Sequence, residues 1–358
     1  MTLVAAGIES LSPYEAGKPA EEVARELGVQ EAIKLASNEN PLGPSQLAIE
    51  AVRRTVLGVH RYPDAAAFLL REALAHRLGV SADEIVQGNG SNELIELVLR
   101  TFCTPAHHVV FAEPSFVVYR MVALAHGVPY TAVALRNHRH DLDAMAEAVR
   151  PTTRLVYIAN PNNPTGTHVS RGDLGRFLLR VPEEVVVVID EAYAEYADAL
   201  DYPPALHLRS LRERLIVLRT FSKIYGLAAL RVGFAVGPVA LTTYMHRVRA
   251  PFNVGSLGQV AALAALEDTA HVERSRALNL EQRAKLSDFL KAFGTVVPSQ
   301  ANFVYVELDR PARPVFEALL TRGVIVRPFT NLPSSLRITV GTEAENNALM
   351  HAMEEVLS

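Results

Sequence analysis

Short apolar runs recur between about residues 45 and 250, and amphipathic stretches separate them. The runs are rich in Val and Ile, which is typical of strands buried on both faces of a sheet. They are EIVQ (84–87), HVVFA (108–112), PYTAVAL (129–135), RLVYIA (154–159), EVVVVID (184–190), RLIVLR (214–219) and RVGFAV (231–236). Helical spacing marks AAAFLLREALAHRL (65–78), SNELIELVLRTF (91–102) and SRGDLGRFLLRV (170–181). This alternation predicts an α/β fold with a mostly parallel central sheet and helices on both faces.

The pattern changes after Pro251. Helical spacing covers 256–293, and it is followed by FVYVEL (303–308), RPVFEALLTRG (313–323), GVIVRP (323–328), LRITVG (336–341) and a last helix from about 343. These elements predict a smaller α+β domain. We therefore expect an N-terminal arm that forms part of the small domain (1–45), a large domain (46–250) and a small C-terminal domain (251–358). The arm is expected to pack on the small domain or to reach another subunit.

Composition narrows the class of protein. The chain has 358 residues, 49% of them apolar, and a net charge of −4, so it can bury a core of roughly two domains. No long basic stripe is present, which argues against a nucleic-acid partner. The single cysteine, Cys103, excludes an intrachain disulfide and fits a reducing compartment. No apolar segment approaches about 20 residues and no basic leader precedes one, so we expect no membrane span and a cytoplasmic protein.

One lysine stands out because the chain has few. Five of the 35 basic residues are lysines, and between Lys34 and Lys285 there is only Lys223. Lys223 follows the run RLIVLR, and ligands collect at the C-terminal ends of strands in open α/β sheets. A lysine there can form a Schiff base with a carbonyl compound, whereas an ordinary surface lysine is the alternative. The neighbours Thr220, Ser222 and Arg231 supply hydroxyl and guanidinium donors that suit a phosphate.

Polar side chains follow two other strands of the predicted sheet. Asp190 ends the run VVVVID, and it is either a metal ligand or the partner of a buried cation. No Asp or His stands at ligand spacing, so we favour the cation, for which a protonated pyridine nitrogen is a candidate. Tyr193 could then bond a ring hydroxyl. Asn163, within the turn sequence NPNNPTG (160–166), could reach a ligand at the same edge.

The stretch GNGSNELIE (88–96) follows a strand and opens a helix, so its main-chain amides could bind an anion. A dinucleotide site is the alternative, with Gly88, Gly90 and a later acid at Glu113, but Glu93 occupies the third glycine position. A single phosphate accounts for more of the sequence. RNHRHD (136–141) has paired histidines, but no further ligand is evident, and we predict a solvated loop and no metal site.

Taken together, these motifs resemble the fold-type I pyridoxal-phosphate enzymes of the aminotransferase class I and II superfamily. Within it, the chain is most similar to the histidinol-phosphate aminotransferases, over almost its whole length. The resemblance is carried by SPYEAGKP (12–19), LASNENPLGPS (35–45), RYPD (61–64), GNGSNELI (88–95), EPSFVVY (113–119), NPNNPTG, IDEAYAEY, SKIYGLAALRVGF and LRITVGT (336–342). It implies pyridoxal 5'-phosphate as cofactor and transamination between histidinol phosphate and 2-oxoglutarate, with glutamate as the other amine.

The resemblance also implies roles for single residues. Lys223 would hold the cofactor as a Schiff base and carry a proton, Asp190 would pair with the pyridinium nitrogen, and Phe116 would stack on the ring. The remaining cofactor contacts would be Asn163 and Tyr193 at the phenolic oxygen, and Gly90, Ser91, Asn92, Thr220, Ser222 and Arg231 at the phosphate.

For the substrate, the resemblance implies that Arg337 binds the anionic group. Tyr14 would close over the substrate, and Asn38 and Arg327 would line the same pocket; a surface position is the alternative for Arg327. Tyr62 would reach the phosphate in the neighbouring subunit, which implies a homodimer. The alternatives are a threonine-phosphate decarboxylase, an aromatic amino-acid aminotransferase and a non-enzymatic sensor of pyridoxal phosphate.

Overall fold

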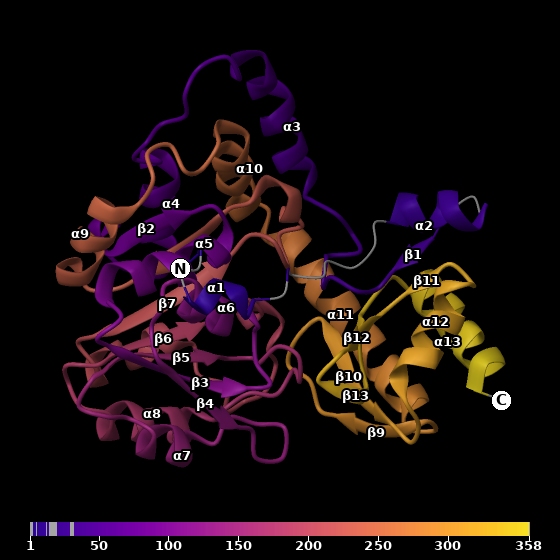
Figure 1. Ribbon diagram of the computed structural model, residues 1–358. Coiled ribbons are helices and arrows are strands. Elements are labelled where there is room, and N and C mark those ends of the chain that lie inside the picture. Colours follow the sequence, from indigo (N-terminus) through magenta and orange to yellow (C-terminus); the bar gives the residue numbers. More distant parts are fainter. Residues whose placement is uncertain (1–2, 5, 12, 14–19, 29–31, 358) are drawn as a thin grey trace.

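The molecule has two parts, and a seven-stranded sheet lies at the centre of the larger one (Figure 1). The computed structural model describes residues 3–4, 6–11, 13, 20–28 and 32–357. The strand order is β2-β8-β7-β6-β5-β3-β4, and β8 runs antiparallel to β2 and β7 while the other neighbours are parallel. The strands are β2 (Ile85–Gly88), β3 (His108–Glu113), β4 (Tyr130–Ala134), β5 (Thr153–Ala159), β6 (Val186–Asp190), β7 (Leu215–Thr220) and β8 (Gly233–Val236). The predicted α/β fold with a mostly parallel sheet is confirmed.

The alternation of side chains along β6 explains why helices cover both faces of this sheet. Val186 and Val188 pack in one cluster with α5 (Gly90–Phe102) and α6 (Val118–Ala125). Val187 and Ile189 pack in another with α7 (Leu142–Glu147) and α8 (Arg171–Arg180). Because successive residues of a strand point to opposite faces, Asp190 at the end of β6 lies on the α5–α6 side.

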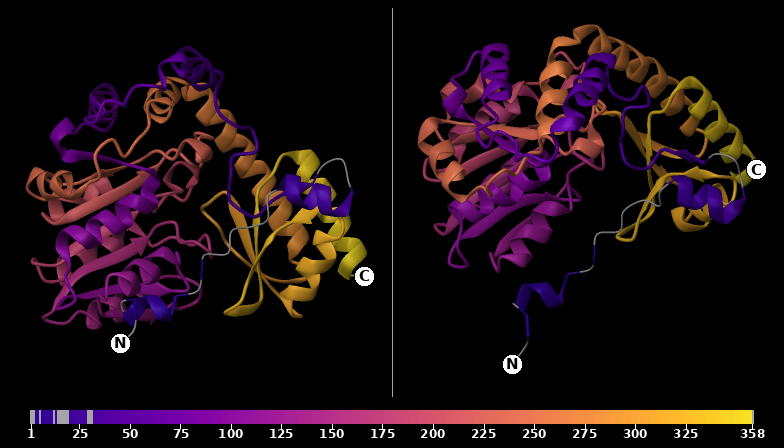
Figure 2. Two further views of the ribbon diagram at one scale, coloured as in Figure 1. Left: turned by 45° about the horizontal axis from the view of Figure 1, so that its top comes forward. Right: turned by 90° about the horizontal axis from the view of Figure 1, so that it is seen from above.

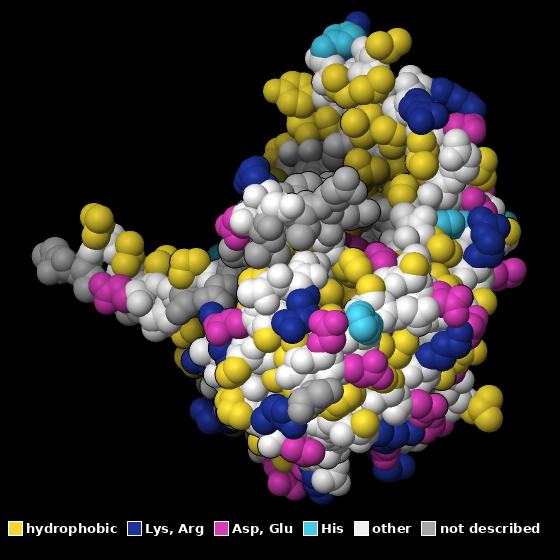
Figure 3. Space-filling view, turned by 90° about the vertical axis from the view of Figure 1, so that its right-hand side faces the viewer, with side chains coloured by type: hydrophobic (Ala, Val, Ile, Leu, Met, Phe, Trp, Pro, Cys, Tyr) yellow, Lys and Arg dark blue, Asp and Glu magenta, His cyan; other side chains and the backbone are white. Residues whose placement is uncertain are grey.

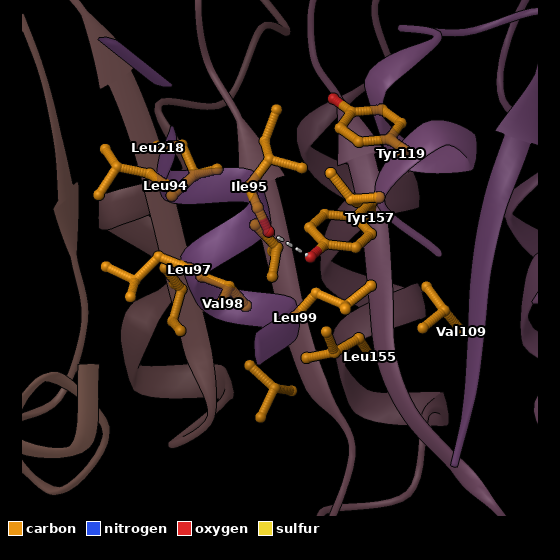
Figure 4. Close-up of a cluster of buried hydrophobic side chains, with 14 of the residues drawn as sticks. Leu94, Ile95, Leu97, Val98, Leu99, Val109, Tyr119, Leu155, Tyr157 and Leu218 are labelled. Carbon is orange, nitrogen blue, oxygen red and sulfur yellow. Dashed lines mark hydrogen bonds between the residues drawn. The ribbon is translucent and has the colours of Figure 1, made fainter. Parts of the chain in front are cut away.

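Figure 4 shows the core on the α5–α6 side, where leucines and valines of α5 meet β5 and β7. Further helices cover the β2 and β8 end of the sheet. These are α3 (Gln46–Thr55), α4 (Phe68–Leu78), α9 (Val239–Val248) and α10 (Ser256–Glu267), with short 3-10 turns at Val56–Gly58, Ala82–Glu84, Ala194–Tyr196, Ala205–Leu211 and Ala228–Leu230. Helix α10 packs against α3 and α4, so the apolar packing of the larger part continues beyond residue 250.

A four-stranded antiparallel sheet lies beside the larger part, as the views in Figure 2 show. Its order is β12-β13-β10-β9, with β9 (Gly294–Val297), β10 (Phe303–Leu308), β12 (Arg327–Phe329) and β13 (Leu332–Thr339). Its helices are α11 (Thr269–Leu290), α12 (Ala312–Leu320) and α13 (Glu343–Leu357). The sequence predicted the helices and β10 well. It missed β9, because GTVV lies next to a turn and is only partly buried.

The N-terminal segment joins the two parts. Before residue 45 the structure has α1 (Ala6–Glu9), α2 (Ala20–Leu27) and β1 (Ile33–Lys34), and β1 pairs in parallel with β11 (Val324–Ile325) beside the small sheet. The chain then crosses to α3 and buries Asn38 and Asn40 on the way. The pairing of β1 with β11 agrees with the expectation that this segment packs on the small domain. None of the helices described here has both the length and the apolar character needed to cross a bilayer.

Candidate active site

A cavity of about 390 Å³ lies between the two sheets, at the C-terminal ends of β5, β6 and β7. The small-sheet side contributes Arg337, and the crossing segment contributes Ser37 and Asn38. The sequence-predicted residues that line the cavity are Asn38, Ser91, Asn92, Phe116, Asn163, Asp190, Tyr193, Thr220, Ser222, Lys223, Arg231 and Arg337. Residues spread over 300 positions of the sequence therefore meet in one space.

Lys223 lies on the turn directly after β7, with its amine facing the cavity. Nζ donates a hydrogen bond to the main-chain oxygen of Ser37 (3.1 Å) and lies 5.7 Å from the centre of the Tyr193 ring. Burial, and secondly the positive charge of Arg337, lowers the pKa of Lys223 to about 8. A sizeable fraction of this amine is therefore neutral near pH 7.5, which is the form that attacks a carbonyl carbon.

Asp190 also lines this cavity. The hydroxyl of Tyr119 donates to Oδ2 (2.8 Å), while Oδ1 is buried and has no hydrogen-bond partner among the described residues. Burial raises the pKa of Asp190 to about 6, although the hydrogen bond from Tyr119 opposes that rise. A buried acceptor without a partner is costly, so Oδ1 is suited to accept a hydrogen bond from a bound group.

An anion cradle forms one end of the cavity. Ser91 and Asn92 lie in the first turn of α5, whose main-chain amides donate no hydrogen bond to the side chain of the preceding Asn89. Arg231 donates to the hydroxyl of Ser222 (3.2 Å). Gly90 has φ +76°, and a Cβ there would lie 2.4 Å from the guanidinium of Arg231. Free amides, hydroxyls and a guanidinium together match a phosphate group.

The rim of the cavity is held by polar contacts between the two parts of the molecule. The Asn38 side-chain amide donates to the hydroxyl of Tyr193 (3.0 Å) and accepts from Thr339 of β13 (3.1 Å). Asn163 accepts from Arg337 (2.6 Å). Asn38 itself has φ 57°, a left-handed conformation that asparagine tolerates better than most residues. The rim thus depends on how the small sheet sits against the large one.

Two arginines stand opposite each other on neighbouring strands. Arg327 of β12 and Arg337 of β13 are direct register partners, and like charges in that position repel. Arg337 also donates to the main-chain oxygen of Ala36 (2.6 Å) and lines both the main cavity and a second one, of about 540 Å³, which Arg327 lines as well. An anion bound near this pair would offset their repulsion.

Two predicted residues lie elsewhere. Tyr62 is 82% exposed and stacks on Phe252 with ring centres 4.7 Å apart, so it belongs to the outer surface of this chain. Tyr14 lies outside the described residues.

Sequence reasoning also missed two buried residues that flank Asp190. Tyr119 is one, and its only signal was its place in EPSFVVY; the other is Glu191, which is fully buried and paired with Arg219.

Comparisons with known proteins agree in one family. The family described as aminotransferase class I and II matches residues 30–353. A histidinol-phosphate aminotransferase of Anaeromyxobacter sp. is 48% identical, with all of both chains covered. Another, of Moorella thermoacetica, is 47% identical over 98% of this chain and 92% of that relative. The crystal structure of the histidinol-phosphate aminotransferase from Sinorhizobium meliloti in complex with pyridoxal-5'-phosphate matches with a TM-score of 0.90 and 28% identity, covering 100% of this chain and 98% of that one.

Proposed function

Since this chain belongs to the class I and II aminotransferases, we propose that it moves an amino group between histidinol phosphate and 2-oxoglutarate in histidine biosynthesis. Pyridoxal phosphate is the cofactor. The observation that carries the proposal is the presence, at one cavity, of a partly buried amine at Lys223 and of a buried Asp190 oxygen that has no hydrogen-bond partner among the described residues.

The residues present fit this cofactor at three points. The unpartnered Asp190 oxygen matches a protonated ring nitrogen, because a buried carboxylate needs a charged or hydrogen-bonded partner. The cradle of Gly90, Ser222 and Arg231 matches the phosphate. Phe116 offers a ring face in the cavity wall, where it can stack on a pyridine ring.

The chain's own groups divide the work as follows. The cofactor, when bound, supplies an aldehyde for the amino group and a protonated ring that withdraws charge from the reacting carbon. Asp190 would keep the cofactor's ring nitrogen protonated, and Tyr193 and Asn163 would hydrogen-bond its phenolic oxygen. Ser91, Asn92 and Thr220 complete the phosphate site. Nζ of Lys223 would hold the cofactor and, as a free amine, would act as the base and acid that moves the substrate's proton.

The substrate must be anionic in both half-reactions. Histidinol phosphate carries a phosphate, whereas glutamate carries carboxylates, and one arginine fork accepts either group. We assign that role to Arg337, which is buried and lines the main cavity. Arg327 and Asn38 complete the pocket, and the second cavity gives the longer phosphate ester room to extend toward Arg327.

Mixing experiments test the assignment. The purified protein loaded with cofactor is mixed with histidinol phosphate, glutamate, threonine phosphate or phenylalanine, and its visible absorption is followed. Histidinol phosphate and glutamate should each bleach the band, and 2-oxoglutarate should restore it. Release of carbon dioxide from threonine phosphate, or faster bleaching by phenylalanine than by histidinol phosphate, would instead support the decarboxylase or the aromatic aminotransferase.

The proposal includes a homodimer with shared active sites. Exposed apolar side chains cluster around α3 and α4, and Figure 3 shows hydrophobic groups gathered on the projecting upper part of the molecule, where α3 lies. They include Leu57 (86% exposed), Val59, Tyr62, Phe68 and Leu69. A contiguous exposed apolar surface of this kind marks an interface. A second copy seated there would bring its Tyr62 to the phosphate of this chain.

Two further assignments complete the proposal. We propose a cytoplasmic location, which suits a chain with one cysteine and a role in amino-acid biosynthesis. We also propose that residues 46–250 form the cofactor-holding domain and residues 251–358 most of the smaller one. The packing of α10 on α3 favours moving that boundary to near Asp268, between α10 and α11.

A further inference from the structure

Tyr119 touches two of the groups that would hold the cofactor ring in the proposed function, on which this inference rests. It lies in the first turn of α6 and is fully buried. Its hydroxyl donates to Oδ2 of Asp190 (2.8 Å), and its ring meets Phe116 edge-on, with centres 5.9 Å apart at 87°. Its face stacks on Tyr157 of β5, with centres 5.0 Å apart at 7° (Figure 4). The hydrogen bond to Asp190 and the ring contacts with Phe116 and Tyr157 therefore fix the position of the Tyr119 side chain.

We propose that Tyr119 is a positioning residue, which turns the Asp190 carboxylate toward the ring nitrogen of the cofactor and holds it in its anionic form. A carboxylate rotates about its Cβ–Cγ bond, and a hydrogen bond to one oxygen fixes that rotation. With Oδ2 engaged, Oδ1 is left as the oxygen that has no hydrogen-bond partner among the described residues, on a side chain that lines the cavity. Tyr119 also contacts Phe116 edge-on, and Phe116 is the residue whose ring would stack on the cofactor. One buried side chain therefore positions both the carboxylate and the stacking ring.

A buried phenol suits this task because it keeps the proton that it donates to the carboxylate. Burial, and secondly the charge of Asp190, raises the pKa of Tyr119 well above its usual value, so the hydroxyl keeps its proton across the working pH range. The other charged groups near Asp190 are Glu191, which raises the carboxyl pKa, and Lys223, which lowers it. Of the lowering contributions, the hydrogen bond from Tyr119 is the largest. Without it, the carboxylate would be protonated more easily and free to turn.

The chain contains a matched control. Tyr157 is also fully buried and shares the stack, but its hydroxyl donates to the main-chain oxygen of Ile95 (2.9 Å), as the dashed line in Figure 4 shows. Tyr119→Phe and Tyr157→Phe each remove one buried hydroxyl and keep the ring. A general loss of packing or stability would affect both variants alike, whereas an effect through Asp190 would appear only in Tyr119→Phe.

Both variants are loaded with pyridoxal phosphate and compared with the unchanged protein. For Tyr119→Phe, kcat should fall about tenfold with the KM values of both amines within about threefold, because a hydrogen bond to a charged group is lost. The pH at which the visible absorption of the bound cofactor changes should rise by about one unit, because a ring nitrogen that is less often protonated withdraws less charge. Tyr157→Phe should leave both measurements unchanged.

A combined variant separates this inference from a failure of the proposed function. In an Asp190→Asn background, adding Tyr119→Phe should change kcat less than twofold, because the residue acts through the carboxylate. An equal loss in both backgrounds, or a pH titration of Tyr119→Phe that matches Tyr157→Phe, would overturn the inference. The unchanged protein reports separately on the proposed function, through its bleaching by histidinol phosphate. If Tyr119→Phe does not fold, Tyr119→His retains a donor and should recover most of the spectrum.

Discussion

At the scale of single residues, the strongest expectation concerns Lys223. Lys223→Ala should abolish covalent attachment of the cofactor while the chain still folds, because the side chain faces a cavity and its Nζ is bonded only once, to the oxygen of Ser37, among the described residues. Borohydride reduction followed by mass measurement should add a cofactor-sized mass to the unchanged protein and none to the variant. Lys285→Ala, an exposed change on α11, should label normally. Labelling of Lys223→Ala at another lysine would contradict the assignment.

Because Asp190 is buried, we expect the free energy of unfolding of the cofactor-free protein to depend on pH. Its pKa is raised from 3.8 to about 6 by burial, so the folded state binds more protons than the unfolded state between those values. The stabilisation present below pH 4 is therefore lost as the pH rises through about 6, by on the order of 2–3 kcal/mol. Asp190→Asn should remove this loss and be more stable than the unchanged protein at pH 8.

Urea unfolding of the cofactor-free proteins from pH 4 to pH 8 measures this effect. The control is Asp288→Asn, which changes an exposed carboxylate on α11 and should follow the unchanged protein. Parallel pH curves for Asp190→Asn and the unchanged protein would show that the buried carboxylate carries no such cost. A ligand that gives Oδ1 of Asp190 a charged partner in the folded state would offset this cost.

At the scale of elements, an ion pair ties the two strands that carry the lysine and the aspartate. Glu191 follows Asp190 at the end of β6, and Arg219 precedes Thr220 on β7; they are joined at 2.7 Å with Glu191 fully buried. Glu195 also faces Arg219 at 3.7 Å. Arg219→Met would leave these carboxylates uncompensated and should lower the free energy of unfolding by about 3–5 kcal/mol.

A double variant identifies the charge as the cause. Glu191→Gln combined with Arg219→Met removes the closest partners and should recover much of the lost stability and cofactor affinity, because of the two carboxylates that Arg219 faces only Glu195 then stays uncompensated. Urea unfolding and cofactor titration measure the two quantities. Additive losses in the double variant would mean that packing of the long arginine side chain, rather than the ion pair, holds the strand ends together.

Arg327 and Arg337 lie opposite each other on β12 and β13, and we expect both substrates to bind their anionic groups there. Arg337→Ala should raise the KM of both histidinol phosphate and glutamate at least about tenfold, because a charge-assisted pair is lost in each half-reaction. Arg313→Ala, on the exposed side of α12, should leave both unchanged. Steady-state kinetics with each amine makes the comparison. A loss confined to one substrate would mean that the two anions bind at different arginines.

The sequence predicted most of the strands and many of the residues that line the cavity. The apolar runs ended at Asp190, where the structure ends β6, and at Arg219, one residue before the end of β7, because buried parallel strands leave a strong apolar signal. Lys223, Asp190 and Asn163 were found because they follow such strands, whereas Asn38, Phe116 and Arg337 were found only through the family resemblance. Tyr119, Glu191 and Arg219 were not, because their importance comes from contacts between elements, and a tyrosine in an apolar helix looks the same whether or not it meets a carboxylate. Strand β9 was missed because its local signal is weak.

At the scale of the whole molecule, the cavity of a single chain is not lined by Tyr62, which the family resemblance assigns to the cofactor phosphate. Tyr62 stacks on Phe252 at the outer surface, among exposed apolar side chains such as Leu57 and Phe68. In a twofold dimer the same surface serves both copies, so each Tyr62 would be offered to the partner's site. Association of two chains would then cover the apolar surface and complete two active sites at once.

Subunit mixing tests this sharing directly. Lys223→Ala and Tyr62→Ala should each be nearly inactive, since one lacks the amine and the other a phosphate contact. Mixed in equal amounts under conditions that allow exchange, they should regain about a quarter of the unchanged activity, because half of the dimers are hybrids and each hybrid has one complete site. Sedimentation before and after mixing must show dimers of one size. If activity stays at the sum of the two variants while hybrids form, Tyr62 serves its own chain and the shared-site arrangement is wrong.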